Sequence, residues 1–176
     1  MGWKSVKEFY DIRHIVQVTS KGICIGSSYI HDIIVIDKNT GVVIKPYLKD
    51  GWSSNDDLLR YQSEMNGDPE KLKELVSQED KFEKHIPVFT YDGAEIIQEF
   101  CEELGWPNIT HDGNIMYENT YSQDMEQVIK WAKKEAEAII KSSQYRVQDI
   151  KNDLDKVEKR LSTAKRNLQT LNKMSV

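Results

Sequence analysis

The residues that could do acid–base chemistry are the four histidines, two of which stand directly before an aspartate. His31 precedes Asp32 in a β-rich stretch, and His111 precedes Asp112 at a predicted hairpin. Such a pair could act as a general base with its orienting carboxylate if both side chains reached one substrate. Neighbouring residues of a strand point to opposite faces of a sheet, so neither pair can act as a unit. The sequence therefore predicts no catalytic residue.

Signatures of metal, phosphate and nucleophile chemistry are also missing from the sequence. The four histidines, which are His14, His31, His85 and His111, do not show a recognised spacing of metal ligands. There is no glycine-rich phosphate loop, and no Ser, Cys or Lys stands in a known nucleophile motif. We therefore expect no bound metal, no cofactor and no enzymatic activity.

Polar and aromatic side chains concentrate in the segment Thr110–Tyr121. The members of this group are His111, Asn114, Tyr117, Glu118, Asn119 and Tyr121. Such a mixture can bind a small polar ligand or a nucleotide, for which the candidate residues are His111, Asn114, Tyr117 and Asn119. The alternative is a polar hairpin whose Ile115 and Tyr117 pack inward.

An acidic block covers Asp50–Leu104, where 15 acidic residues stand against 5 basic ones. Such a block is usually a solvated helical surface, but it can also engage a basic partner or imitate nucleic acid. For the second interpretation, the candidate contact residues are Asp56, Asp57, Glu70 and Glu74. The chain does not predict direct DNA binding, because phosphate contacts need a concentrated basic face.

The cysteines and the hydropathy indicate the compartment. Cys24 and Cys101 are isolated in apolar runs, as is typical of reduced core cysteines in a cytosolic protein. The longest apolar run is Ile33–Ile36, which predicts neither a signal peptide nor a membrane span. We expect a cytoplasmic protein without a membrane partner.

The order of predicted elements indicates an α+β fold. A short helix at Lys4–Tyr10 is followed by an antiparallel β-meander, and together they make up residues 1–48. The strands of the meander are Arg13–Thr19, Ile23–Gly26, Tyr29–Ile36 and Val42–Lys45.

Residues 49–121 are predicted to complete the same compact body with two acidic helices and a β-α-β-β unit. The helices are Asp56–Met65 and a second one that Asp68 caps and Pro69 begins. The unit starts with the strand His85–Tyr91, after which Asp92-Gly-Ala-Glu95 fits a capping box that opens a helix ended by Gly105. Asp112-Gly113 then predicts a two-residue hairpin turn between Ile109–His111 and Ile115–Glu118.

The strongest pattern is a heptad repeat near the end of the chain. No Gly or Pro occurs between Ser122 and Met174, so one long helix is predicted over 122–174, with a coiled-coil segment at 140–171. A 3.5-residue apolar period produces a narrow apolar seam, whose side chains are buried when another helix packs against it. The predicted interface consists of Ile140, Val147, Ile150, Leu154, Val157, Leu161, Ala164, Leu168 and Leu171.

The rim of the seam, which consists of the charged residues at the e and g positions beside it, favours an antiparallel homodimer. With Val147 at position a, a parallel pair would place like charges together, such as Asp153 against Glu158. An antiparallel pair with Leu154 against Val157 of the partner gives attractive contacts instead. The alternatives are that the seam packs on the chain's own helices or on a different partner. Upstream, a broader stripe predicts packing on the globular body, through Val128, Trp131, Ala132, Ala136 and Ile139.

Two segments, Val88–Glu95 and Trp106–Thr120, resemble small uncharacterised accessory proteins of tailed bacteriophages. The resemblance covers roughly the second half of the chain and carries no catalytic residues. It implies a small, acidic, soluble phage product of the kind that binds and disables a host protein in the host cytoplasm.

These patterns together predict a non-enzymatic, protein-binding homo-oligomer, which the resemblance would make a phage inhibitor of a host defence or nucleic-acid enzyme. One alternative is a small-ligand sponge or sensor, with a nucleotide as the ligand. A second alternative is a metal-dependent hydrolase or nuclease whose site is assembled from scattered acids.

Overall fold

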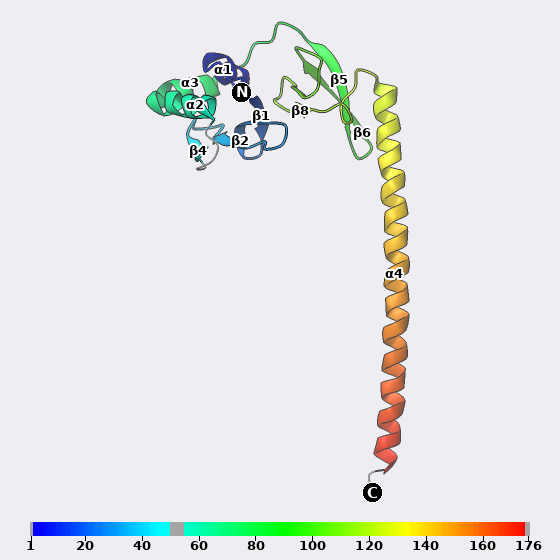
Figure 1. Ribbon diagram of the computed structural model, residues 1–176. Helices are drawn as coiled ribbons and strands as arrows, with labels where there is room; N and C mark the ends of the chain where they lie inside the picture. The colour runs from blue at the N-terminus through cyan, green and yellow to red at the C-terminus, as the bar shows by residue number, and fades with distance from the viewer. Residues whose placement is uncertain (1, 50–54, 175–176) are drawn as a thin grey trace. The chain divides into compact units, whose positions relative to one another are not determined.

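The computed structural model, which describes residues 2–49 and 55–174, has an α+β fold. As predicted, it contains an antiparallel four-stranded sheet near the N-terminus and a long C-terminal helix (Figure 1). The elements are α1 (Trp3–Phe9), β1 (Ile15–Thr19), β2 (Gly22–Gly26), β3 (Ile34–Ile36), β4 (Val43–Lys45), α2 (Asp56–Gly67), α3 (Pro69–Ser77), β5 (Ile86–Asp92), β6 (Glu95–Cys101), β7 (Asn108–Ile109), β8 (Ile115–Met116) and α4 (Met125–Met174). The chain divides into two compact units, Met1–Ile129 and Lys130–Val176.

The N-terminal sheet has the strand order β1-β2-β3-β4 and buries both of its faces. One face packs with the three short helices into the main core through a cross-strand row made of Val18, Ile23, Ile36 and Val43. These residues are β-branched, and such side chains pack well on a pleated surface.

The opposite face carries a second cross-strand row, made of Gln17, Cys24, Val35 and Lys45. The first three of these side chains are buried. The loop between β2 and β3 covers them, because Gln17 donates to the carbonyl of His31 at 3.4 Å and Lys45 pairs with the Asp32 carboxylate at 3.2 Å.

Side chains from other elements fix both ends of α1. Asp80 accepts hydrogen bonds from the N–H groups of Lys4 and Ser5 at 2.9 and 2.8 Å, in the first turn. The helix ends in a Schellman motif at Asp11, whose φ of 46° is left-handed. Arg60 of α2 donates to the carbonyls of Tyr10 and Asp11 at 3.1 and 3.3 Å, so it ties α2 to the end of α1.

Helices α2 and α3 begin at side-chain caps. The Asn55 side chain accepts from the N–H of Leu58, and the Asp68 side chain accepts from the N–H of Lys71. Asp68 with Pro69 at the first turn of α3 is the predicted start signal, which is confirmed.

The predicted helix after Asp92 is wrong, because Glu95–Cys101 is the strand β6, paired with β5 along its whole length. Asp92 pairs with Glu95, so Gly93 and Ala94 form a two-residue hairpin loop. Gly93 has φ 57°, which suits the first central position of a type II′ turn. The unit is therefore two consecutive hairpins and not β-α-β-β.

The second hairpin, β7–β8, has a longer turn than predicted. Thr110 donates its N–H to Asn114 at 2.9 Å, which leaves a three-residue loop that ends at Gly113 with φ 86°. A second small core lies between the two hairpins and consists of Val88, Cys101, Met116 and Tyr121.

Helix α4 starts where Asp124 accepts hydrogen bonds from the N–H groups of Glu126 and Gln127 at 2.9 and 3.3 Å. It then runs without interruption for 50 residues. Among the described residues, no helix has the length and apolar character required for a membrane span.

Candidate functional site

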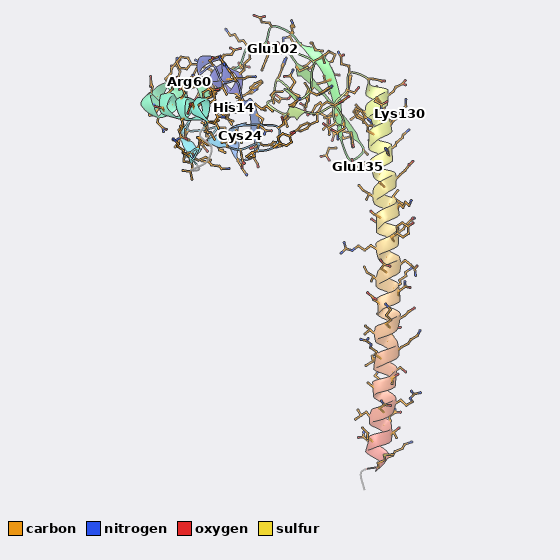
Figure 2. The ribbon with its side chains drawn as sticks, viewed as in Figure 1. His14, Cys24, Arg60, Glu102, Lys130 and Glu135 are labelled. Carbon is orange, nitrogen blue, oxygen red and sulfur yellow. The ribbon has the colours of Figure 1, made fainter. Side chains whose placement is uncertain are left out.

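Among the residues that the structure describes, the exposed stripe along α4 is the largest set of unburied apolar side chains. Residues 133–174 of the helix are all exposed, and their side chains project from it on every side (Figure 2). All nine residues of the predicted interface are exposed. Apart from Ala164, each exposes between 51% (Val147) and 62% (Leu171) of its surface. A contiguous apolar stripe of this length is the usual mark of an interaction surface.

The start of α4 differs from this stripe. Val128 is buried, Trp131 and Ala132 are half-buried, and Ala136 and Ile139 are exposed. Burial within the predicted broader stripe therefore ends near Ala132, and an exposed apolar surface begins a turn later.

The polar residues that flank the stripe are largely unpaired. Asp153 pairs with Lys156 at 2.9 Å within the helix. Lys151, Glu158 and Arg160 form no ion pair with any residue in the described ranges. These side chains are free to interact with a second helix.

The four residues proposed to bind a polar ligand do not lie together in the structure. His111 stacks on Phe82, Asn114 donates to Glu99 at 3.1 Å, and the Tyr117 hydroxyl lies 2.9 Å from Nε2 of His31. Asn119 is exposed. The hairpin residues thus serve separate contacts and do not converge on one site.

His111 is held in an aromatic column between Phe82 and Phe100. Its ring centroid lies 3.8 Å from that of Phe82 and 6.3 Å from that of Phe100. Burial lowers the pKa of His111, and its Nε2 lies 3.0 Å from the carbonyl oxygen of Lys84, which can only accept. Nε2 therefore carries the proton.

The neighbours His31 and Asp32 have different partners. His31 contacts Tyr117, whereas Asp32 pairs with Lys21 at 2.5 Å and with Lys45. The hydrogen bonds from Lys21 and Lys45 hold the pKa of Asp32 below its usual value. The Asp32 carboxylate therefore fastens the loop over the sheet.

An ion pair that the sequence does not signal joins α1 to the end of β6. The Lys4 ammonium lies 2.7 Å from the Glu102 carboxylate, which is labelled in Figure 2. Burial raises the pKa of Glu102, but the hydrogen bonds from Lys4 and from the N–H of Glu83 outweigh burial and lower it. The two residues are 98 positions apart, so no local pattern could reveal the contact.

The predicted acidic contact residues lie in the first turns of α2 and on α3. Asp56, Glu70 and Glu74 are exposed, and Asp57 is half-buried. Asp56, Asp57 and Glu70 stand in first turns, where a carboxylate is favoured by the helix dipole, and Glu74 pairs with Lys71 at 3.0 Å. Asp50, at the start of the acidic block, lies outside the described residues.

Cys24 and Cys101 are buried free thiols, as predicted, and burial raises the pKa of both. Within residues 2–49 and 55–174, no group of three or more His, Cys, Asp or Glu side chains is arranged to hold a metal ion. Comparisons with protein families, with curated proteins and with solved structures find no match to this chain.

Proposed function

We propose that this protein is a non-enzymatic, protein-binding homodimer whose two copies pair through α4 as an antiparallel coiled coil. The exposed apolar stripe of α4 carries the proposal. Burying such side chains contributes roughly 25 cal/mol per Å², and another helix with the same repeat offers a matching surface along the whole seam.

Charge on the rim supports the antiparallel orientation. When Leu154 of one helix packs against Val157 of its partner, Asp153 faces Arg160 twice and Lys151 faces Glu158 twice. Each exposed pair contributes roughly 0.2–1 kcal/mol, and like-charge contacts in a parallel pair cost a similar amount. The rim therefore selects orientation, while the apolar seam supplies the affinity.

The sizes of the seam residues support the same register. A parallel pair would stack Ala164 on Ala164 and Ser143 on Ser143, and each small–small layer leaves space in the interface. The antiparallel register places Ala164 against Val147 and Ser143 against Leu168. Beyond these layers, the exposed Ile139 faces Met174 of the partner and extends the apolar contact.

This register determines the distance between the two helix starts in the dimer. The two-fold axis passes between Asp155 and Lys156, and the helix rises about 1.5 Å per residue. The two Met125 residues at the starts of α4 are therefore about 90 Å apart. The two helix starts would therefore lie at opposite ends of the paired segment.

For the partner, we propose a host protein with a basic surface, which the dimer would inhibit as a phage product in the host cytoplasm. The resemblance of Val88–Glu95 and Trp106–Thr120 to phage accessory proteins supports this, as does the acidic surface around Asp56, Asp57 and Glu70. Co-purification of a host defence or nucleic-acid enzyme is expected. Stabilisation by nucleotides, or metal-dependent cleavage of nucleic acid, would instead support one of the two alternative functions.

The dimer is tested by substituting Leu154→Glu together with Leu161→Glu. Both positions lie in the seam, so a dimer would have to bury four carboxylates, which costs far more than the rim charges contribute. Light scattering should show a dimer for the native chain and a folded monomer for the variant. Equal masses for both proteins would refute self-association through α4.

A further inference from the structure

A cavity of 440 Å³ opens beside α1, within the first unit of the chain. Its apolar lining comes from α1 and the turn after it, from the segment before β5 and from β7, and consists of Trp3, Ile12, Phe82 and Ile109. Trp3, Ile12 and Ile109 are buried in the main core. A cavity of this size can hold a small molecule, and its lining combines these four apolar side chains with charged and polar ones.

The walls of the cavity are fixed before any ligand arrives. The Trp3 indole donates to the carbonyl of His111 at 2.8 Å, and the His111 ring stacks on Phe82. The Lys4 ammonium binds the Glu102 carboxylate and donates to the carbonyl of Lys81 at 2.8 Å. A ligand would therefore bind without the cost of ordering these groups.

The rim of the cavity has an excess of negative charge. It carries four carboxylates and two ammonium groups, from Lys4, Lys7, Glu8, Asp11, Glu102 and Glu103. Lys4 is already engaged by Glu102 at 2.7 Å and by Glu8 at 3.6 Å. Glu103 has no ion pair with another described residue, and Lys7 is the one rim cation left to oppose a bound cation.

We propose that this cavity binds a small organic cation with an aromatic or aliphatic body, such as a primary amine. The body would lie on the apolar lining, and the ammonium would lie at the rim near Glu103. The excess of carboxylates disfavours a nucleotide phosphate. This site does not depend on the coiled coil and goes beyond the proposed function.

The test titrates the full-length protein with 2-phenylethylamine, with the neutral 2-phenylethanol and with AMP, each to about 10 mM, a range that reaches weak binding. The readout is the indole ¹H–¹⁵N signals, one for each of the four tryptophans. The amine should shift the Trp3 signal and bind most tightly of the three. Glu103→Gln should weaken its binding roughly 1.5- to 5-fold, and Lys7→Gln should strengthen it by a similar factor.

A matched control is Glu95→Gln, which removes one exposed carboxylate from β6, outside this cavity, and should leave the affinity for the amine unchanged. Absence of a shift at Trp3, equal binding of the alcohol, or tighter binding of AMP would each overturn the proposal. Equal effects of Glu103→Gln and Lys7→Gln would overturn recognition of charge at the rim. Because the native full-length protein is used throughout, failure here leaves the light-scattering test of self-association intact.

Discussion

At the scale of single residues, Asp11 is the one non-glycine position with a left-handed backbone among the residues that the structure describes. It closes the Schellman motif after α1, a place that glycine occupies without a steric penalty. Asp11→Gly should therefore stabilise the protein by about 0.5–1 kcal/mol. The pair with Arg13 at 3.9 Å that it removes is largely exposed to solvent and adds little.

Urea unfolding measures this change, and Asp11→Ala is the matched control. Alanine also removes the carboxylate but keeps a Cβ in the left-handed region, so it should not stabilise. A gain of equal size for both variants would show that the carboxylate, and not the backbone, sets the free energy of unfolding at this position.

His111 makes folding sensitive to pH. Burial lowers its pKa in the folded protein from the ordinary value of 6.5, so the unfolded chain binds this proton at higher pH. Its contribution to stability is complete above pH 6.5 and is lost as the pH falls from 6.5 through the folded pKa. The urea concentration at the unfolding midpoint should therefore be lower at pH 5.5 than at pH 7.5. This difference between the two pH values should be smaller in His111→Gln than in the native protein. An identical pH dependence in both proteins would contradict this.

At the scale of elements, the turn between β5 and β6 depends on backbone conformation alone. Gly93 has φ 57°, and a Cβ added there would meet nothing within 4 Å. Gly93→Ala should thus lower the free energy of unfolding by about 1–2 kcal/mol through its positive φ, whereas Gly93→Asn should cost less, because Asn is accepted after Gly at the positive-φ positions of hairpin turns. Thermal unfolding of the two variants makes the comparison. Equal losses would point to a steric cause instead.

The same turn shows where sequence reasoning fails. Asp92-Gly-Ala-Glu95 fits both a helix capping box and a hairpin turn. The apolar residues that follow fit both the helical period of 3.6 residues and the strand period of two. Cross-strand pairing with Ile86–Asp92 decides for the strand, and this pairing is a tertiary contact that local sequence does not contain. The Asp68-Pro69 start of α3 was predictable because its cap is local. The cavity beside α1 was not, since its Lys4–Glu102 wall joins distant positions.

At the scale of the whole molecule, the proposed register predicts a distance. Ser142 lies on the exposed side of the heptad, and the two copies of this residue would be about 40 Å apart along an antiparallel coil. In a parallel coil they would lie within roughly 20 Å of each other, since paired helices are 8–10 Å apart at their axes. A spin label on Ser142→Cys is specific because both native cysteines are buried. Double electron–electron resonance should give the longer distance.

Charge reversal at Arg160 separates the two orientations by the sign of its effect. In the antiparallel register, Arg160→Glu places Glu against Asp153 twice, so two attractive contacts become repulsive. The dimer should then weaken by about 1–3 kcal/mol at low salt. In a parallel pair, the new glutamate at position 160 would face Lys165 of the partner and strengthen the dimer.

Within the helix, Glu at this position lies four residues after Lys156, so helix formation is not weakened. Sedimentation equilibrium measures the dissociation constant, and Asp153→Arg combined with Arg160→Asp should restore it. A tighter dimer in Arg160→Glu would exclude the antiparallel register.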